Sequence, residues 1–359
     1  MILVGSVLVN VTEDAPKQIR PGEELDVAKL TEYLERQFGP GAVTVAQFPG
    51  GHSNLTYLVR HGDAEYVLRR PPFGSKVKSA HDMGREFTVL TKLSAVYQRA
   101  PKPFAYESTG EVLGAPFYLM ERRRGVILRK DLPDGLVHDH ARLRRVGELL
   151  IEALVDLHAV DYGAAGLGEF GKPVGYIERQ LTGWAKRYAD SQTETIPALD
   201  ESAAWLAAHM PADGPPSLIH NDYKFDNVIF DPSLERITGV LDWEMATLGD
   251  PMMDLGTSLS YWAQADDPPS YDQPFGPTAT VGMLTRSELA AHYFERSGRR
   301  PVDPLFYYTF GLIKTAVVLQ QIYYRWHKGV TTDPRFGALI MGVKMLSDRA
   351  RNAIDRGSI

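Results

Sequence analysis

The residue types best suited to chemistry lie between positions 218 and 244 of the chain. Asp222 and Asn227 stand in a polar segment that follows an apolar run, and Asp242 ends a second apolar run at 237–241. Phosphoryl transfer to a hydroxyl needs a carboxylate beside the attacking oxygen and two oxygen ligands that hold Mg²⁺ on the nucleotide. The two carboxylates and the carboxamide therefore predict a phosphoryl-transfer site.

Each of these side chains has an expected role. We expect Asp222 to be the catalytic base that accepts or orients the proton of the acceptor hydroxyl. Asn227 lies five positions later, which is the spacing from base to metal ligand in kinase catalytic loops. Asn227 and Asp242 are therefore the expected Mg²⁺ ligands, while Glu244 either reaches the same ion through water or is solvated. The alternative, an ordinary polar turn with Asx caps, requires the loop spacing and the later aspartate to coincide by chance.

The flanking polar residues are expected to support this loop. His220 is predicted to brace the loop rather than take part in the reaction. Asp250 and Asp254 open a predicted helix, where a carboxylate can cap backbone N–H groups. We expect a structural role there, with one of these acids bracing the catalytic loop from below.

A glycine-containing turn near residue 50 is a candidate for nucleotide binding. Gly50 and Gly51 are followed by Ser53 and Asn54, between two strand-like runs. Glycine lets backbone N–H groups approach a phosphate closely, and the two polar side chains add donors. We therefore predict nucleotide contacts from Ser53 and Asn54, with a plain hairpin turn as the alternative.

A basic residue at the end of a strand-like run provides a second nucleotide contact. Arg69 follows the run at 66–68 and is expected to pair with the α and β phosphates, with Glu86 holding it through an ion pair. Arg70 is the competitor, because successive side chains of a strand face opposite ways. The alternative is a solvated arginine at a strand edge and a glutamate on a helix surface.

These residues need a scaffold, which the hydrophobic periodicity predicts. An amino-terminal antiparallel sheet is expected from β-rich runs at 43–45, 55–59, 66–68, 111–113 and 117–120. Helices are expected at 24–38, 81–97, 140–160, 174–189, 199–209, 253–263, 286–296, 304–328 and 334–356. The fold class is therefore α+β, with a nucleotide-binding lobe at 1–121 and a helical lobe at 122–359 that carries the catalytic loop, metal site and acceptor pocket. Ligand pockets tend to form in the cleft between such domains.

Composition limits the classes of function. Of the 359 residues, 44% are hydrophobic and 23% charged, and the formal net charge of −6 disfavours nucleic acid as a partner. The absence of cysteine excludes disulfides, thiolate metal sites and a cysteine nucleophile, and it suits a reducing cytosol. Residues 1–9 lack the features of a signal peptide and are expected to form an arm or edge strand. No apolar run is long enough to span a bilayer, so we expect a cytoplasmic protein without a membrane partner.

Together these motifs resemble those of the aminoglycoside phosphotransferase-like branch of the protein-kinase-like fold. The resemblance covers about residues 45–256, and His220-Asn221-Asp222 is similar to the His-Gly-Asp of that family. It implies a two-lobed fold with an antiparallel-sheet N-lobe and a mainly helical C-lobe. It also implies that Asp222 is the base and that Asn227 and Asp242 bind Mg²⁺. Adenine would be bound at the hinge by backbone groups around Met120, Glu121 and Arg123.

The segments 66–72 and 79–86 resemble a narrower subgroup, the kinase-like domain that some eukaryotes fuse to acyl-CoA dehydrogenases. That subgroup implies a hydroxy-acid or hydroxyacyl-type metabolite as acceptor. Three positions depart from the wider family. Arg69 replaces the usual lysine, so a phosphate contact would be bidentate, Asn221 replaces glycine, and Lys224 stands where many small-molecule kinases carry histidine.

We therefore predict an ATP- and Mg²⁺-dependent small-molecule kinase, with GTP as a possible nucleotide and the acceptor and oligomeric state left open. One alternative is aminoglycoside phosphorylation, for which Asp266, Asp267 and Asp272 would supply an acidic acceptor site. Another is a catalytically silent nucleotide-binding scaffold. A protein kinase is disfavoured, because only seven residues separate Asp242 from Asp250 and leave little room for an activation loop.

Overall fold

The structure is a computed structural model that describes residues 2–4, 7–9, 14–49, 54–73, 82–129, 132–133, 135–268, 276–331 and 333–359. The chain divides into two compact units, each described by itself here. The N-terminal unit comprises Met1–Ile127, Gly163–Leu167 and Asn227–Ala246, and the helical unit comprises Leu128–Tyr162, Gly168–Asp226 and Thr247–Ile359. Asp222 therefore belongs to the helical unit, whereas Asn227 and Asp242 belong to the N-terminal unit.

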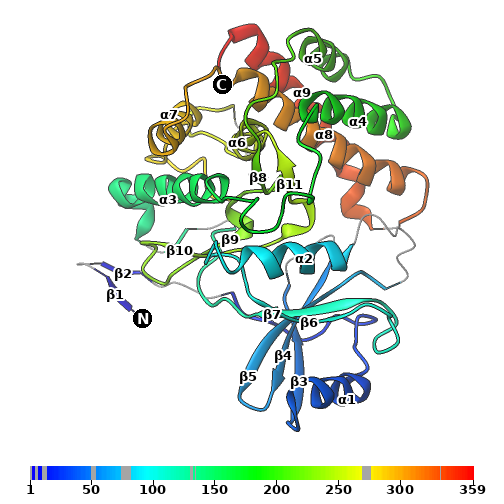
Figure 1. Ribbon diagram of the computed structural model, residues 1–359. Coiled ribbons are helices and arrows are strands. Elements are labelled where there is room, and N and C mark those ends of the chain that lie inside the picture. The colour runs from blue at the N-terminus through cyan, green and yellow to red at the C-terminus, as the bar shows by residue number, and fades with distance from the viewer. Residues whose placement is uncertain are drawn as a thin grey trace. The chain divides into compact units, whose positions relative to one another are not determined.

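A five-stranded antiparallel sheet forms the centre of the N-terminal unit (Figure 1). Its strand order is β3 (Val43–Gln47), β4 (Leu55–His61), β5 (Ala64–Arg70), β7 (Phe117–Glu121) and β6 (Pro103–Glu107). Alternate residues such as Tyr57, Val59 and Leu68 face one core, where they meet Leu30 and Leu34 of helix α1 (Val27–Phe38). Helix α2 (Met83–Leu93) packs against β6 and β7. Burial of this apolar face holds the sheet in register, because a slip by one residue would turn every side chain over.

One predicted strand is wrong. Residues 111–113 form a turn, and the strand that pairs with β7 lies earlier, at Pro103–Glu107. The Glu107 carboxylate accepts hydrogen bonds from the amides of Thr109 and Gly110, which fold the chain back directly after the strand. Leu113 is apolar because it enters the core of the unit from this turn. The other four predicted strands of this sheet are present.

Smaller strand pairs complete the architecture. In the N-terminal unit, β9 (Val228–Phe230) pairs antiparallel with β10 (Ile237–Val240), and the terminal arm forms a short hairpin of β1 (Ile2–Val4) and β2 (Val7–Val9). In the helical unit, β8 (Ser217–Ile219) pairs antiparallel with β11 (Thr247–Gly249). The β8–β11 pair places the segment after Ile219 beside the segment that leads into the next helix.

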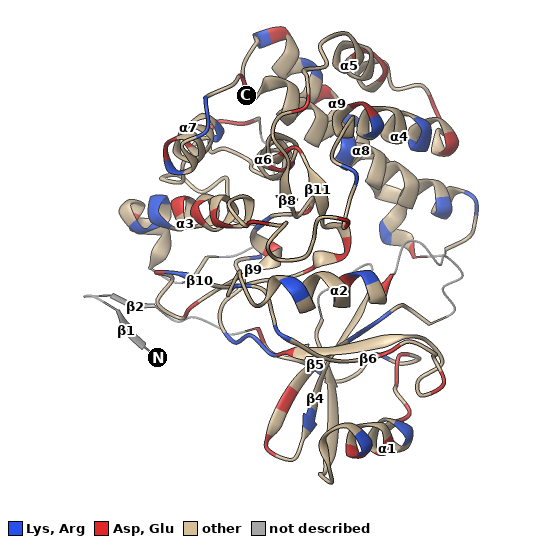
Figure 2. Cartoon of the chain, in the orientation of Figure 1, with Lys and Arg blue, Asp and Glu red and all other residues tan. Residues whose placement is uncertain are grey.

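Every helix that was predicted in the helical unit is present (Figure 1). They are α3 (His140–His158), α4 (Tyr176–Ser191), α5 (Pro197–Ala208), α6 (Pro251–Ser260), α7 (Arg286–Ser297), α8 (Leu305–His327) and α9 (Leu339–Arg356), the last preceded by a 3-10 turn at Pro334–Ala338. Side chains cap the starts of three of them, namely Asp139 in α3, Asp250 in α6 and a Thr285–Glu288 capping box in α7. Basic and acidic segments are interspersed on α3, α4 and α7 (Figure 2). Among the described residues, no helix combines the length and apolar character needed to cross a bilayer.

Helix α8 is the central helix of this unit and packs against α4, α5, α6 and α9. Its contact with α6 is close because two glycines face it. A Cβ at Gly256 would lie 2.3 Å from the Tyr307 carbonyl oxygen, and one at Gly311 would lie 2.7 Å from the Gly256 carbonyl oxygen. The backbones of α6 and α8 therefore pack at a distance that no larger residue allows.

We expect Gly256→Ala to destabilise the protein by about 1–3 kcal/mol, because the added methyl meets backbone atoms that cannot move away. Gly183→Ala in α4 is the matched control, since the nearest atom to its added Cβ is the flexible end of Arg187. The control should be neutral or slightly stabilising. Urea denaturation of both variants measures the difference, and equal midpoints would contradict the close contact.

Candidate active site

The β9–β10 hairpin brings the two predicted metal ligands together. Asn227 directly precedes β9, Asp242 follows β10 after one residue, and the Leu241 N–H donates to the Asn227 carbonyl at 2.8 Å. In an antiparallel pair, the start of one strand and the end of the other lie at the same end of the ladder. The two polar residues are thus neighbours for a reason of topology.

The chemistry of this pair fits Mg²⁺. The donor set is a carboxamide and a carboxylate, which are hard oxygen ligands, and Mg²⁺ is usually held by one or two carboxylates plus substrate phosphates. Within the described part of the chain, no group of three or more histidine or acidic side chains could hold a metal by itself. The site therefore suits an ion that a nucleotide helps to bind. Asp242 also has a left-handed backbone with φ 68°, which turns the chain sharply after β10.

A buried arginine connects this hairpin to the sheet and to α2. Arg69 Nη1 lies 3.0 Å from Glu86 Oε1, and Nη2 lies 2.8 Å from Asp242 Oδ1. The predicted ion pair between Arg69 and Glu86 is therefore present. Burial works to lower the pKa of Arg69, but the charges of Glu86 and Asp242 outweigh it and raise that pKa well above its ordinary value. Arg70 faces the other way, donates to the Leu113 carbonyl at 3.1 Å and stacks on Phe73.

Two further contacts organise the same region. The Trp243 N–H donates to Glu86 Oε1 at 3.1 Å, and Asn54 Nδ2 donates to Glu244 Oε2 at 2.6 Å. Glu86 thus positions both the arginine and the backbone after Asp242. Asn54 thus contacts Glu244, which lies shortly after β10. The predicted contact of Asn54 with a nucleotide phosphate stays a prediction. Ser53, the other predicted donor, lies outside the described residues.

The expected adenine-binding segment ends strand β7. Met120 is buried, and the Glu121 N–H donates to the Lys102 carbonyl at 2.8 Å, so this amide is already used within the sheet. The side chain of Arg123 ion-pairs with Glu121 at 2.9 Å. It also donates to the backbone carbonyls of Gln98, Ala100 and Thr238. The Arg123 side chain therefore has a structural role, and any contact with adenine from this residue would come from its backbone.

We expect Glu86→Ala to destabilise the protein by about 3 kcal/mol, since it leaves the buried Arg69 without its most buried partner. Glu32→Ala on the exposed face of α1 is the matched control and should change stability by less than about 0.5 kcal/mol. Thermal and urea unfolding measure both effects. Equal stability of the two variants would show that the ion pair is dispensable.

In the helical unit, a buried carboxylate of α6 braces the loop that contains Asp222. Asp254 Oδ2 accepts the His220 N–H at 2.7 Å, and Asp254 Oδ1 accepts the Asn221 N–H at 2.7 Å. Burial works to raise the pKa of Asp254, but the hydrogen bond and charge of His158 and the contacts of His220 hold it below its ordinary value. The expected bracing acid is therefore Asp254. Asp250 instead caps α6 and binds the Gly214 amide.

The Asp222 carboxylate contacts the side chains of Lys224 and Tyr261. Its two carboxylate oxygens lie 3.0 and 2.9 Å from Lys224 Nζ, and Oδ1 accepts a hydrogen bond from the Tyr261 hydroxyl at 2.7 Å. The Asp222 N–H donates to His220 Nδ1 at 3.2 Å, so the histidine braces the loop as predicted. The Asp222 side chain remains 19% exposed and is accessible to a ligand. That Asp222 lies close to Asn227 and Asp242 stays a prediction, because those two residues belong to the other unit.

The residue before Asp222 is held more firmly than the sequence indicates. Asn221 has a left-handed backbone with φ 68°, a conformation that glycine adopts most readily. Its side-chain oxygen accepts a hydrogen bond from the Tyr176 hydroxyl at 3.0 Å, and its carbonyl accepts one from Lys314 Nζ at 2.5 Å. Asparagine tolerates this conformation better than most residues, and these bonds offset the remaining strain.

Sequence reasoning missed Tyr176, Tyr261 and Lys314. The two tyrosines gave no signal, because each lies about forty residues from the loop in sequence. Lys314 did give one, since it is the single charged residue in the apolar stretch 305–317. A charge inside a buried helix needs a partner. Burial lowers the pKa of Lys314 from 10.5 to about 8, although Asp222 and Asp254 act in the opposite direction.

The lowered pKa predicts a pH-dependent stability. Because the unfolded chain binds the proton of residue 314 more tightly, stability should rise between pH 8 and pH 10.5, by on the order of 3 kcal/mol relative to Lys314→Met. Urea denaturation across this range measures the difference between the two proteins. Lys344→Met, at an exposed lysine of α9, should follow the wild-type curve. Parallel curves for wild type and Lys314→Met would contradict the assignment.

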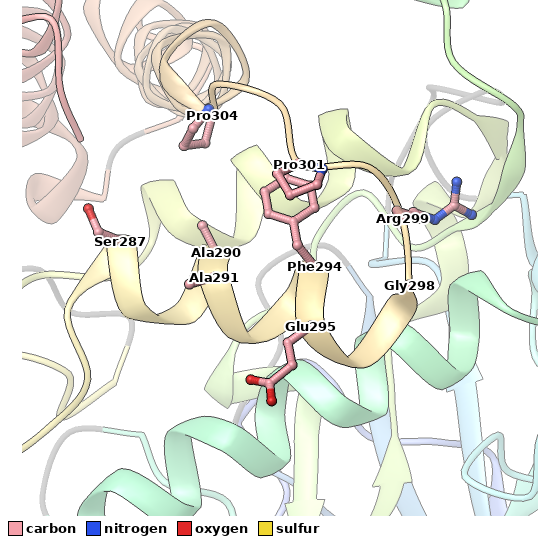
Figure 3. Close-up of a pocket in the computed structure, with 9 residues that line it drawn as sticks. All are labelled: Ser287, Ala290, Ala291, Phe294, Glu295, Gly298, Arg299, Pro301 and Pro304. Carbon is pink, nitrogen blue, oxygen red and sulfur yellow. The ribbon is translucent and has the colours of Figure 1, made fainter.

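A separate pocket of about 530 Å³ lies along α7 and the segment that follows it (Figure 3). Its lining residues are Ser287, Ala290, Ala291, Phe294, Glu295, Gly298, Arg299, Pro301 and Pro304. None of them is a predicted site residue. We therefore do not assign this pocket to the acceptor.

Comparison with known proteins shows the family of the chain. A family model described as "Phosphotransferase enzyme family" matches residues 44–286. The chain belongs to this family. It is 33% identical over 331 residues to acyl-CoA dehydrogenase family member 11 of Rattus norvegicus, covering 89% of the chain but only 42% of that protein. The chain thus spans about two fifths of this relative.

Solved structures show the fold. A putative aminoglycoside phosphotransferase from Ralstonia eutropha JMP134 superposes with a TM-score of 0.77 and 29% identity, over 93% of this chain and 99% of that one. A ternary complex of aminoglycoside phosphotransferase APH(4)-Ia with AMP-PNP and hygromycin B has a TM-score of 0.58 and 17% identity, over 90% and 98%. The protein therefore has the α+β protein-kinase-like fold that the sequence predicted.

Proposed function

We propose that the protein transfers the γ-phosphoryl group of ATP to a hydroxyl group of a small metabolite, with GTP as an alternative nucleotide. The observation that carries this proposal is Asp222, a partly exposed carboxylate on a loop that Asp254 braces through two backbone amides. Membership of the phosphotransferase family supports it. In the reaction, the hydroxyl oxygen forms the new bond to phosphorus, the bond from phosphorus to the β–γ bridging oxygen breaks, and ADP leaves.

The residues have separate tasks in this proposal. Asp222 orients the acceptor hydroxyl and accepts its proton, which is the contribution that a largely dissociative transition state requires. The Tyr261 hydroxyl fixes the direction of the carboxylate. Lys224 is placed beside Asp222, where an ammonium can neutralise charge on the transferred phosphoryl group.

The N-terminal unit supplies the nucleotide contacts. Asn227 and Asp242 would hold Mg²⁺, which supplies charge neutralisation of the phosphates when it is bound. Arg69, held by Glu86, would contact phosphate oxygens in a bidentate manner. The AMP-PNP complex of the structural neighbour supports a nucleotide in this fold.

The acceptor is proposed to be a hydroxy-acid or hydroxyacyl-type metabolite rather than an aminoglycoside. A polycationic drug needs free carboxylates, yet Asp267 is bound by Arg286 at 2.6 Å and lies 3.5 Å from Arg349. Its side chain is only 7% exposed. Asp272, the third acid of the aminoglycoside alternative, lies outside the described residues. Lys224 beside Asp222 further disfavours a cationic acceptor.

We expect Asp222→Ala to lower turnover by about 100- to 10 000-fold while nucleotide binding persists, because the base acts on the acceptor and not on ATP. The test measures ADP formation from Mg·ATP with a panel of hydroxy acids, hydroxyacyl thioesters and aminoglycosides. Asp190→Ala, at an exposed aspartate of α4, is the matched control and should retain full turnover. Wild-type turnover in the Asp222 variant would remove the basis of the proposal.

A further inference from the structure

A buried lysine contacts the loop that carries the proposed catalytic base. Lys314 is only 4% exposed, and its ammonium reaches the Asn221 carbonyl at 2.5 Å. Burying a charged group is costly unless it is bound by polar partners, and an aliphatic side chain would fill the same space in α8 without this cost. The glycine contact of Gly256 with Gly311 brings α8 close enough for the lysine to reach the loop.

The atom that Lys314 binds is informative. The Asn221 carbonyl and the Asp222 N–H belong to one peptide group, which is planar and moves as a unit. Lys314 holds the carbonyl side of this group at 2.5 Å, and His220 Nδ1 holds the N–H side at 3.2 Å. Asp254 fixes the preceding amide at 2.7 Å. With both sides bound, the peptide plane cannot rotate, and the Asp222 side chain leaves the backbone in one direction.

We propose that Lys314 is a positioning residue for phosphoryl transfer, whose ammonium holds the peptide between Asn221 and Asp222 and so directs the Asp222 carboxylate. The inference rests on the proposed role of Asp222 as the base. Lys314 binds the backbone of the loop, so in this proposal it acts on Asp222 through the peptide that it holds. A displacement of about 1 Å at a reacting group can cost about 100-fold in rate, which sets the size of the expected effect.

The charge of Lys314 makes the arrangement sensitive to pH. The charged groups that act on its pKa are Asp222 and Lys224 from the loop and Asp254 from α6, and the hydroxyls of Tyr176 and Tyr261 contact the same loop. The pKa of Lys314 is about 8, so the lysine is protonated below that pH and neutral above it. A neutral amine binds the carbonyl more weakly than an ammonium does. Turnover should therefore fall as the pH rises through about 8.

The test compares Lys314→Met, Lys314→Arg and the matched control Lys344→Met. The readouts are phosphate release from Mg·ATP with water as acceptor, the same assay with any acceptor that the panel identifies, and nucleotide affinity. Lys314→Met should lose about 100-fold in turnover with unchanged nucleotide affinity and without the alkaline decline. Lys314→Arg should recover part of the turnover and show no decline near pH 8, because arginine stays charged. Lys344→Met should behave as the wild type.

A measurement without substrate completes the test. Hydrogen exchange of the peptide spanning residues 218–224 should be faster in Lys314→Met than in the wild type, whereas Lys344→Met leaves it unchanged. Wild-type turnover, pH profile and exchange in Lys314→Met would overturn the inference. Full activity of Asp222→Ala would instead overturn the proposed function, and the exchange result would still decide whether Lys314 orders the loop. If Lys314→Met does not fold, the pH profile of Lys314→Arg decides.

Discussion

The buried carboxylate of Asp254 is the constraint on which the loop of Asp222 depends. It binds two consecutive backbone amides, of His220 and Asn221, and receives His158 from α3 on the same oxygen that binds the first amide. Because the amides of His220 and Asn221 are fixed, the backbone of the next residue, Asp222, is held in position. The arrangement explains why α6 starts immediately after β11, since the paired strands β8 and β11 deliver the loop and the helix to the same place.

Helix α8 extends this constraint. Glycines at positions 256 and 311 let the backbones of α6 and α8 approach closely, and Lys314 of α8 binds the carbonyl of Asn221, the residue whose N–H Asp254 holds. Packing and electrostatics are thus coupled, because the lysine can be buried only where a carbonyl and two carboxylates accept its charge. The N-terminal unit uses the same principle. There, one buried arginine connects Glu86 of α2 to Asp242, which follows β10.

Much of the fold and of the candidate site could be predicted from short stretches of sequence. Such local patterns are the spacing of Asp222 and Asn227, the strand that precedes Asp242 and the acid that opens α6. They can be recognised without knowing how distant parts of the chain pack. The strand at 111–113 was predicted wrongly, because its apolar residues belong to a turn that Glu107 stabilises. A run of three residues is too short to distinguish a strand from a turn. The helices of the second unit were predicted well because long amphipathic periods average over many residues.

By itself, the sequence determined which residue types are available for the proposed chemistry: two acids, an amide and an arginine at recognisable positions, and no cysteine. It also determined the fold family, since the motifs recur in order along the chain. Only the tertiary structure decided which neighbours those groups have. Tyr261, Tyr176 and Lys314 contact the Asp222 loop from distant parts of the chain. Such contacts depend on how helices pack in three dimensions, and no spacing along the chain encodes them.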